Sequence, residues 1–380
     1  MDLSEYVDFN IGALSNYIIP EPERFIENGN LCFLNTKDFF SKVSGESIRS
    51  FWNLELGTLT QYQHGLGSIL NVAHYHDFTP FRKRPFFEAF DGHCMPIHPS
   101  FIQEKLEAGL FWTIFHTLRD NEERVELFRL WGHLFEVYIN ETLSAASHAD
   151  GRFIPFPKYL DTGEEAFDGI ILQGETCFVF ECKGGFLKAE AKYSDDPDIL
   201  MPDLEMKFGS SKTGALRQLA SHITRVFARK PAERRDIGGL DLRNSKIVVP
   251  VLVVQEKFVS SPFTSYFLAH SFRSELRKQR LAGDINCQCQ RLIVMDAYDV
   301  EALKACNSRG NFSLADCLFS RTFHGDVVLD FHAFLIEYAE ENGLSLKADE
   351  QTNASFAKII DRVSERFFER PIGEKTNGDS

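Results

Sequence analysis

Hydrophobic residues in the middle of the chain follow two different spacings. Between residues 165 and 187, two short apolar runs flank a turn at Gln173–Glu175, and the second run ends before Gly184 and Gly185. This pattern predicts two strands that form a hairpin. From Thr213 to Arg229, apolar residues instead recur at the helical period of about 3.6 residues, which predicts a helix with one apolar face. That face can pack on the sheet that contains the hairpin.

Further strands and helices are predicted before and after this hairpin. Strands are expected at Arg152–Pro155, Lys246–Val254 and Arg291–Met295. Helices are expected at Pro99–Leu118, Asp120–Leu143, Phe263–Leu281, Val300–Ala305, Val327–Glu341 and Phe356–Phe368. The strand at residues 246–254 contains Pro250, which predicts an edge position or a bulge. Strands that alternate with helices predict an α/β fold.

The same pattern predicts how the chain divides. We expect an N-terminal domain at residues 1–97, an α/β domain at 98–305, a helical C-terminal segment at 306–370 and a disordered tail at 371–380. Within the first part, Arg84–Ile97 is interpreted as a hairpin, because Asp91-Gly92 can supply the positive φ of a type I′ turn. Two interpretations of the N-terminal domain stay open: a substrate-selecting or partner-binding domain, and a structural extension of the core.

The composition indicates a protein of the cell interior. No uncharged apolar run reaches the roughly 18 residues that a membrane span needs. The first ten residues are acidic and lack the basic and apolar regions of a signal peptide. The eight cysteines form no Cys-x-x-Cys pair, and several lie in apolar runs, as is typical of a reducing compartment. We therefore expect a cytoplasmic location and no membrane partner.

Charge is unevenly distributed along the chain. A net charge of −14 argues against a protein that coats nucleic acid along its whole surface. The segment Lys207–Arg235 is instead positively charged, with eight basic residues and a single acid, Glu233. The basic residues are Lys207, Lys212, Arg217, Arg225, Arg229, Lys230, Arg234 and Arg235. Such a strip can contact a phosphate backbone, and the alternative is a solvated helix face.

The predicted hairpin gathers three charged side chains at one end. Asp168 begins the first strand, while Glu181 and Lys183 lie near the end of the second, where the strand period places them on one face and Cys182 on the other. Charged groups at the end of an apolar strand are costly to desolvate unless they bind something. A divalent metal would compensate the carboxylates, and the lysine can stabilise negative charge on a phosphate. The pattern therefore indicates phosphodiester hydrolysis.

Residues 122–303 resemble the PD-(D/E)XK nuclease superfamily, which includes type II restriction enzymes, RecB-type nucleases and archaeal Holliday-junction resolvases. In that superfamily an Asp on one strand is followed, across a hairpin, by (D/E)-x-K on the next. The match here is Asp168, Glu181 and Lys183, with Phe167 where a Pro would precede the Asp. The resemblance implies a restriction-endonuclease-like central mixed sheet flanked by helices, with an N-terminal extension and a helical C-terminal segment.

The resemblance also implies roles for residues around the hairpin. Mg²⁺ or Mn²⁺ would be held by Asp168, Glu181 and the backbone carbonyl of Cys182. The catalytic set would be Asp168, Glu181, Lys183, Gln218 and Glu136, the last from the helix before the Asp strand. In RecB-like nucleases a later helix carries Gln followed four residues on by Tyr, and His222 replaces that Tyr here. Contacts to nucleic acid would come from Lys212, Arg217, His222, Arg225 and Arg229. His222 can also be interpreted as a solvated helix residue.

These features lead to one main hypothesis and three alternatives. We expect a Mg²⁺-dependent endodeoxyribonuclease that cuts DNA in restriction, anti-phage defence or repair, as a homodimer or with a defence-system partner protein. The alternatives are a ribonuclease, a non-catalytic module that binds nucleic acid or protein on the same scaffold, and a zinc protein. The zinc alternative rests on His64, His74, His76, His93, Cys94 and His98, which show no recognised zinc spacing; structural or surface histidines are the other interpretation.

Overall fold

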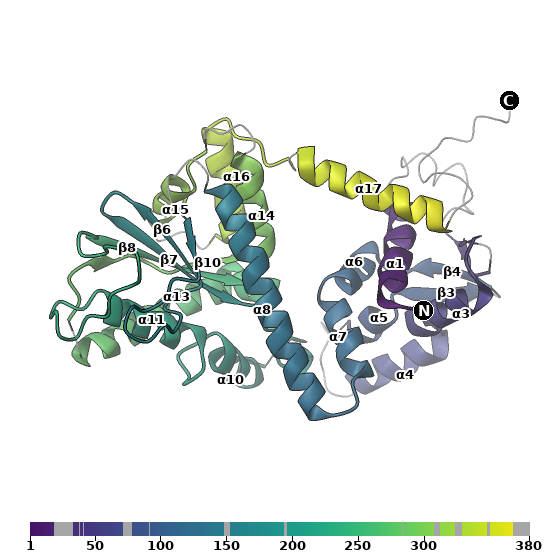
Figure 1. Ribbon diagram of the computed structural model, residues 1–380. Helices are drawn as coiled ribbons and strands as arrows, with labels where there is room; N and C mark the ends of the chain where they lie inside the picture. The colour runs from purple at the N-terminus through teal and green to yellow at the C-terminus, as the bar shows by residue number, and fades with distance from the viewer. Residues whose placement is uncertain are drawn as a thin grey trace. The chain divides into compact units, whose positions relative to one another are not determined.

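The computed structural model describes residues 1–18, 33–37, 39–40, 42–70, 78–90, 92–147, 153–193, 196–282, 284–307, 312–323, 329–347 and 350–367. The chain divides into two compact units, and both contain a β-sheet flanked by helices (Figure 1). The first unit runs from Met1 to Asp120 and includes the C-terminal helix; the second runs from Asn121 to Asp349, apart from residues 193–195. The predicted α/β class is therefore confirmed.

The second unit is built on a mixed sheet in the order β10-β8-β7-β6-β5, with β9 paired to β8. Its strands are β5 (Phe153–Pro155), β6 (Gly169–Gln173), β7 (Thr176–Lys183), β8 (Ile247–Val254), β9 (Gln288–Cys289) and β10 (Ile293–Asp296). β5, β6 and β7 are antiparallel, whereas β7, β8 and β10 are parallel. The predicted hairpin is confirmed as β6 and β7, and Gly174 turns between them with φ of 58°.

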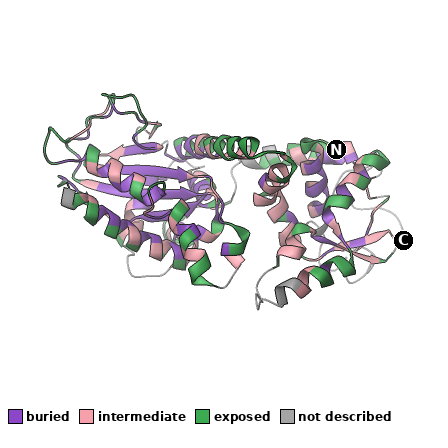
Figure 2. Ribbon diagram, turned by 90° about the horizontal axis from the view of Figure 1, so that it is seen from below, coloured by how far each residue is buried: buried purple, intermediate pink, exposed green. Residues whose placement is uncertain are grey.

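Helices cover both faces of this sheet because its strands are apolar on both sides. On one face Cys177 and Val179 of β7 pack with helices α10 (Pro197–Lys207), α11 (Ala215–Val226) and α13 (Pro262–Ala282). On the other face Phe178 and Phe180 pack with α8 (Asn121–Ala146), α14 (Ala297–Cys306), α15 (Leu314–Phe323) and α16 (Phe331–Glu341). Figure 2 shows the buried strands in purple and the outward turns of the helices in green. The described residues also form two short helices, α9 (Ala189–Tyr193) and α12 (Lys257–Ser260).

The prediction that Pro250 marks an edge strand is wrong. β8 lies between β7 and β10 and is buried along its length from Val248. On the side away from β7, β8 pairs with β9 as far as Val248 and with β10 only from Val251. Pro250 lies in the gap between these two short partners, where a residue without an N–H disturbs the hydrogen-bond ladder least.

The first unit carries the smaller sheet, in the order β1-β4-β3-β2. Its strands are β1 (Leu34–Asn35), β2 (Leu56–Gly57), β3 (Phe86–Phe90) and β4 (His93–Pro96). Its helices are α1 (Leu3–Ile18), α3 (Gly45–Glu55), α4 (Leu59–Leu70), α5 (Thr79–Lys83), α6 (Pro99–Leu106), α7 (Ala108–Thr117) and α17 (Glu350–Phe367). The β3-β4 hairpin confirms the predicted one, with Gly92 at φ of 71°; Asp91 lies outside the described residues.

The C-terminal helix α17 belongs to the core of the first unit. Phe367 packs against Phe9, with ring centroids 4.6 Å apart. Arg362 and Arg366 bind the buried carboxylate of Asp8, at 2.6 and 2.9 Å. Residues 306–370, expected as one helical segment, are thus shared between the units, and the expected tail at 371–380 lies outside the described residues. In the described part of the chain, none of the helices has the length and apolar character needed to cross a membrane.

Candidate active site

The β6-β7 hairpin brings Asp168 to the end of β7. Gly169 pairs with Phe180, so Asp168 lies beside the last residues of the neighbouring strand. The Asp168 N–H donates to the Phe180 carbonyl at 3.0 Å, and the Cys182 N–H donates to Asp168 Oδ2 at 2.5 Å. The first bond holds the Asp168 backbone against β7, and the second holds its carboxylate there.

Glu181 and Lys183 project from the same face of β7 next to this carboxylate. Glu181 Oε1 and Lys183 Nζ lie 2.7 Å apart. The Glu181 side chain is 7% exposed and that of Lys183 is 26% exposed, so the pair is open to solvent on the lysine side. The Cys182 side chain points the other way, into the core with Phe135 and Phe180. Three of the predicted residues are therefore brought together.

Helix α8 adds Glu136 to this group. Burial raises the pKa of Glu136, and the carboxylates of Glu181 and Glu165 raise it further, whereas Lys183 acts in the opposite direction. α8 can approach the end of β7 because residue 184 is glycine: a Cβ there would lie 2.9 Å from the Phe135 Cβ. The close packing of α8 on Gly184 thus holds Glu136 within electrostatic reach of the hairpin.

The site carries more negative charge than its lysine can balance. Burial raises the pKa of Asp168 well above its ordinary value, and the Glu181 carboxylate adds to the effect. Burial alone would lower the pKa of Lys183, but Glu181 and Asp168 outweigh it and raise the pKa above its usual range. With Glu136, three carboxylates face one ammonium, which leaves two negative charges when all are ionised. The site favours protons or a bound cation.

Helix α11 contributes Gln218 and His222. Gln218 Oε1 is buried and accepts no hydrogen bond within the described structure. His222 Nδ1 lies 2.7 Å from the Tyr159 hydroxyl, and its ring contacts Phe167 with centroids 5.8 Å apart. Burial lowers the pKa of His222, while Glu181 acts to raise it. The interpretation of His222 as a solvated helix residue is wrong, because the ring is half-buried, hydrogen-bonded and close enough to respond to Glu181.

Tyr159 is a neighbour of the site that no sequence pattern identifies. It lies in the irregular segment between β5 and β6, where no periodic pattern points to it. The Arg235 guanidinium stacks 3.8 Å from the centroid of its ring and is itself held by Asp161 at 2.8 Å. Burial raises the pKa of Tyr159 to about 12, although Arg225 and Arg235 act in the opposite direction. Tyr159 therefore links His222 to the basic strip.

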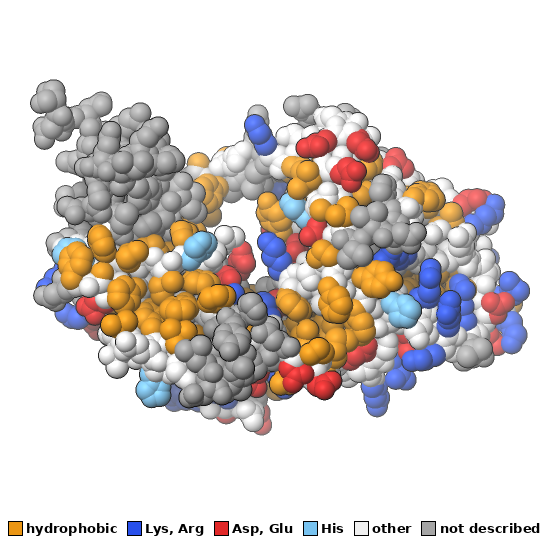
Figure 3. Space-filling view, turned by 180° about the vertical axis from the view of Figure 1, so that it is seen from behind, with side chains coloured by type: hydrophobic (Ala, Val, Ile, Leu, Met, Phe, Trp, Pro, Cys, Tyr) orange, Lys and Arg blue, Asp and Glu red, His pale blue; other side chains and the backbone are white. Residues whose placement is uncertain are grey.

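The basic strip is only partly available to a ligand. Five of its members form ion pairs, with Lys207 on Asp203, Arg229 on Asp284, Lys230 on Glu233, Arg234 on Asp236 and Arg235 on Asp161. Lys212, Arg217 and Arg225 are exposed and form no ion pair with any described residue. Figure 3 shows Lys and Arg side chains gathered over part of the unit that contains the larger sheet. Of the predicted nucleic-acid contacts, Arg229 is the one already paired with an acid.

The described histidines of the first unit form no shared metal site. His98 caps α6 by accepting from the Ser100 N–H at 3.3 Å, and His93 stacks on Phe90 with centroids 4.5 Å apart. His64 is exposed, while His74 and His76 lie outside the described residues. Across the described ranges, no three His, Cys, Asp or Glu side chains are arranged as a ready metal site.

The donors at the end of β7 nevertheless suit a hard cation. Asp168, Glu181 and Glu136 offer only oxygen ligands, which Mg²⁺ prefers. Asp168 Oδ2 and Glu181 Oε1 are engaged with the Cys182 N–H and the Lys183 ammonium, so one oxygen of each carboxylate is in use. Burial, followed by the Glu181 charge, raises the pKa of Asp168, so a cation bound beside the ionised carboxylate would offset both effects.

Comparison with known proteins found no matching family model, no matching curated protein and no matching solved structure.

Proposed function

We propose that the chain is a metal-dependent nuclease that hydrolyses phosphodiester bonds of DNA, with a restriction-endonuclease-like second unit of the PD-(D/E)XK type. The observation that carries this proposal is the meeting of Asp168, Glu181 and Lys183 at the end of one hairpin. A mixed sheet with helices on both faces, with α8 and α11 on opposite sides, is consistent with that type.

In this proposal Asp168 and Glu181 hold Mg²⁺ or Mn²⁺, helped by the Cys182 carbonyl and by Glu136 from α8. When bound, such an ion activates water and neutralises charge on the phosphate. The chain's own contribution is a fixed set of oxygens: the Cys182 N–H holds one oxygen of Asp168, and the packing of α8 on Gly184 holds Glu136. Preorganised charges of this kind need little rearrangement during the reaction.

Lys183 acts as an electrostatic stabiliser in this mechanism. Its carboxylate neighbours raise its pKa, so the side chain keeps its proton at neutral pH and is a poor base. A protonated amine can donate hydrogen bonds to the phosphate oxygens, on which negative charge develops as the bond to the leaving oxygen breaks. Glu181 orients the amine through the 2.7 Å ion pair.

Residues of α11 position the substrate. Gln218 has a buried Oε1 that accepts no hydrogen bond in the described structure, so it can accept one from Lys183 or from a nucleotide. His222 is mostly neutral because burial lowers its pKa, and its Nδ1 is engaged by Tyr159. The exposed Lys212, Arg217 and Arg225 would contact the phosphate backbone.

The decisive experiment exposes the full chain to plasmid, linear and single-stranded DNA and to RNA, with Mg²⁺, with Mn²⁺ and with EDTA. The proposal predicts cleavage of DNA only when metal is present, and none by Asp168→Ala. If the chain cleaved RNA and not DNA, it would be a ribonuclease. No cleavage of any substrate, under conditions in which the metal raises the melting temperature, would contradict a nuclease activity.

One observation favours a second candidate, a non-catalytic module that binds nucleic acid or protein. Glu181 and Lys183 already neutralise one another, and Asp168 is satisfied by a backbone N–H. Charged groups that satisfy one another in this way can serve structure alone. A gel-shift assay distinguishes the two, because a binding module would retain nucleic acid equally well with and without metal and leave it intact.

A further inference from the structure

A group of charged side chains lies where β10 leads into α14, on the same edge of the sheet as the candidate active site. Asp296, the last residue of β10, is in register with Val254 of β8, which pairs in turn with Lys183 of β7. Asp296 and Asp299 form a capping box at the start of α14, in which each carboxylate accepts the backbone N–H of the other residue at 3.0 Å. The box therefore places two buried carboxylates beside one another.

Asp299 has one carboxylate oxygen that the capping box does not use. Its Oδ1 atom is buried and accepts no hydrogen bond from any described residue. On α16, the Nδ1 atom of His332 lies 3.3 Å from this oxygen and also has no hydrogen-bond partner among the described residues. With an added proton, the pair is a carboxylate beside an imidazolium or a carboxylic acid beside a neutral imidazole. Without that proton, an ionised carboxylate is left buried beside a neutral ring.

The surroundings of Asp299 make the loss of this proton costly. The pKa of Asp299 is raised to about 8, first by burial and then by the carboxylates of Asp296 and Asp330, whereas the Asp296 N–H and Lys257 act in the opposite direction. Asp296 also accepts a hydrogen bond from the Ser260 hydroxyl of α12 at 2.9 Å, which keeps this carboxylate close to Asp299. A proton on the Asp299–His332 pair therefore relieves the repulsion among neighbouring acids.

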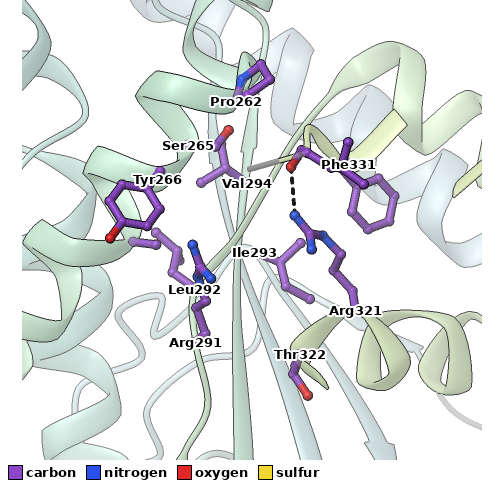
Figure 4. Close-up of a pocket in the computed structure, with 12 residues that line it drawn as sticks. Pro262, Ser265, Tyr266, Arg291, Leu292, Ile293, Val294, Arg321, Thr322 and Phe331 are labelled. Carbon is purple, nitrogen blue, oxygen red and sulfur yellow. Dashed lines mark hydrogen bonds between the residues drawn. The ribbon is translucent and has the colours of Figure 1, made fainter. Parts of the chain in front are cut away.

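His332 connects this buried group to the solvent. Its side chain is 36% exposed, whereas that of Asp299 is 3% exposed. The His332 ring contacts the ring of Tyr298, with centroids 5.0 Å apart. The preceding residue, Phe331, packs in the core with Ile293 of β10, and both line the small cavity drawn in Figure 4. A proton can thus reach the pair from solvent while the start of α16 stays anchored on β10.

We propose that Asp299 and His332 form a proton-dependent latch that joins α14 to α16. The folded chain binds the Asp299 proton more tightly than the unfolded chain does, because the folded-state pKa is raised. The stability that this proton provides is therefore present at low pH and is lost as the pH rises through the raised pKa. At mildly alkaline pH the contact between the two helices should weaken. This inference does not depend on the nuclease proposal.

Hydrogen exchange of the full chain at pH 6 and at pH 9, followed by mass spectrometry and corrected for the intrinsic exchange rate, tests this latch. Peptides from α14 and α16 report how often each helix opens locally. In the wild type, the protection of α16 should fall about fivefold between the two pH values, as expected for the loss of one charge-assisted contact. Equal protection at both pH values would overturn the proposal.

Two variants show whether the pH dependence comes from this pair. Asp299→Asn removes the charge but keeps an oxygen for the capping box, so α16 should be equally protected at pH 6 and pH 9. His332→Phe keeps a ring beside Tyr298 but cannot share a proton, so its protection at pH 6 should fall to the level of the wild type at pH 9. His270→Phe, at an exposed histidine of α13, is the matched control and should behave as the wild type.

Circular dichroism of each variant verifies that it is folded before its exchange is compared with that of the wild type. The proposal is overturned if folded Asp299→Asn keeps the pH dependence of the wild type. It is also overturned if His332→Phe is as well protected as the wild type at pH 6.

Discussion

Asp168 Oδ2 accepts a hydrogen bond from the Cys182 N–H, across fourteen residues of sequence. Cys182 is the residue between Glu181 and Lys183, whose side chains share the opposite face of β7 and lie 2.7 Å apart. A single strand end therefore holds one carboxylate through its backbone and presents a second carboxylate and an amine through its side chains. This arrangement links the fold of the hairpin to the proposed chemistry.

Asp168→Asn should stabilise the protein at neutral pH when no metal is present. Burial, followed by the Glu181 charge, raises the pKa of Asp168, so the folded state binds this proton more tightly than the unfolded chain does. The corresponding stability is present at low pH and is lost as the pH rises through the raised pKa. An amide keeps the shape and can still accept the Cys182 N–H. We expect a gain of about 1 kcal/mol near pH 8 that vanishes near pH 4.

Urea unfolding in EDTA at both pH values measures this gain. If Asp168→Asn were less stable than the wild type near pH 8, the folded protein would be stabilising the ionised Asp168 carboxylate, which contradicts the prediction. A gain of equal size at both pH values would attribute the effect to packing instead.

Divalent metal should stabilise the wild-type chain through the same carboxylates. A ligand that binds only the folded state at about 100 times its Kd adds roughly 2.7 kcal/mol. Thermal unfolding in Mg²⁺ and in Mn²⁺ should therefore show a rise in melting temperature that Asp168→Ala removes. Asp241→Ala is a matched control, because Asp241 is exposed and pairs only with its neighbour Arg243 among described residues. An equal metal effect in both variants would place the metal elsewhere.

Gly184→Ala should displace helix α8 from the end of β7. The new Cβ would lie 2.9 Å from the Phe135 Cβ and 3.2 Å from the Gly132 Cα, so the helix must move. Overpacking of this kind costs about 1–3 kcal/mol, and it would also carry Glu136 away from Glu181. Gly185→Ala is the neighbouring control, since a Cβ there meets nothing within 4 Å. The free energy of unfolding in urea and the cleavage rate should both fall in Gly184→Ala and stay unchanged in Gly185→Ala. A Gly184→Ala variant with wild-type stability and cleavage rate would show that this packing does not position Glu136.

Tyr159→Phe tests the hydrogen bond that connects the loop before β6 to His222. Removing the hydroxyl leaves the His222 Nδ1 atom without this 2.7 Å partner and should cost about 1 kcal/mol of unfolding free energy. The cleavage rate should fall severalfold, because the imidazole loses a contact that orients it. Tyr298→Phe, at an exposed tyrosine of the same unit, controls for loss of a hydroxyl. Equal behaviour of the two variants would show that Tyr159 has no special role.

Local patterns predicted the hairpin and α11 because each element is determined by residues that are close together in the sequence. The turn at Gln173–Glu175 separates two apolar runs, and α11 repeats its apolar residues with one period from Ala215 to Val226. Since Asp168 and Glu181 flank that turn at equal depth, their approach could also be predicted. What could not be predicted is which distant segments pack beside them.

The structural features that could not be predicted depend on contacts between segments that are far apart in the sequence. Tyr159 reaches His222 across 63 positions, and α17 returns to Asp8 across more than 350, with no local pattern that marks either contact. Pro250 predicts an edge position or a bulge because a missing N–H normally excludes a central strand, but the gap between β9 and β10 accommodates it within the sheet. The helix expected at residues 99–118 instead breaks at Glu107, whose backbone leaves the helical region with φ of −88° and ψ of −110°.

The most direct test of the nuclease proposal is the single-turnover rate of DNA cleavage in Mg²⁺ for Lys183→Ala beside Lys188→Ala. Lys188 is an exposed lysine shortly after β7 and controls for the loss of one positive charge. The proposal predicts that Lys183→Ala slows cleavage by at least about 100-fold without loss of fold by circular dichroism, and that Lys188→Ala cuts at nearly the wild-type rate. Cleavage by folded Lys183→Ala at the wild-type rate would contradict it.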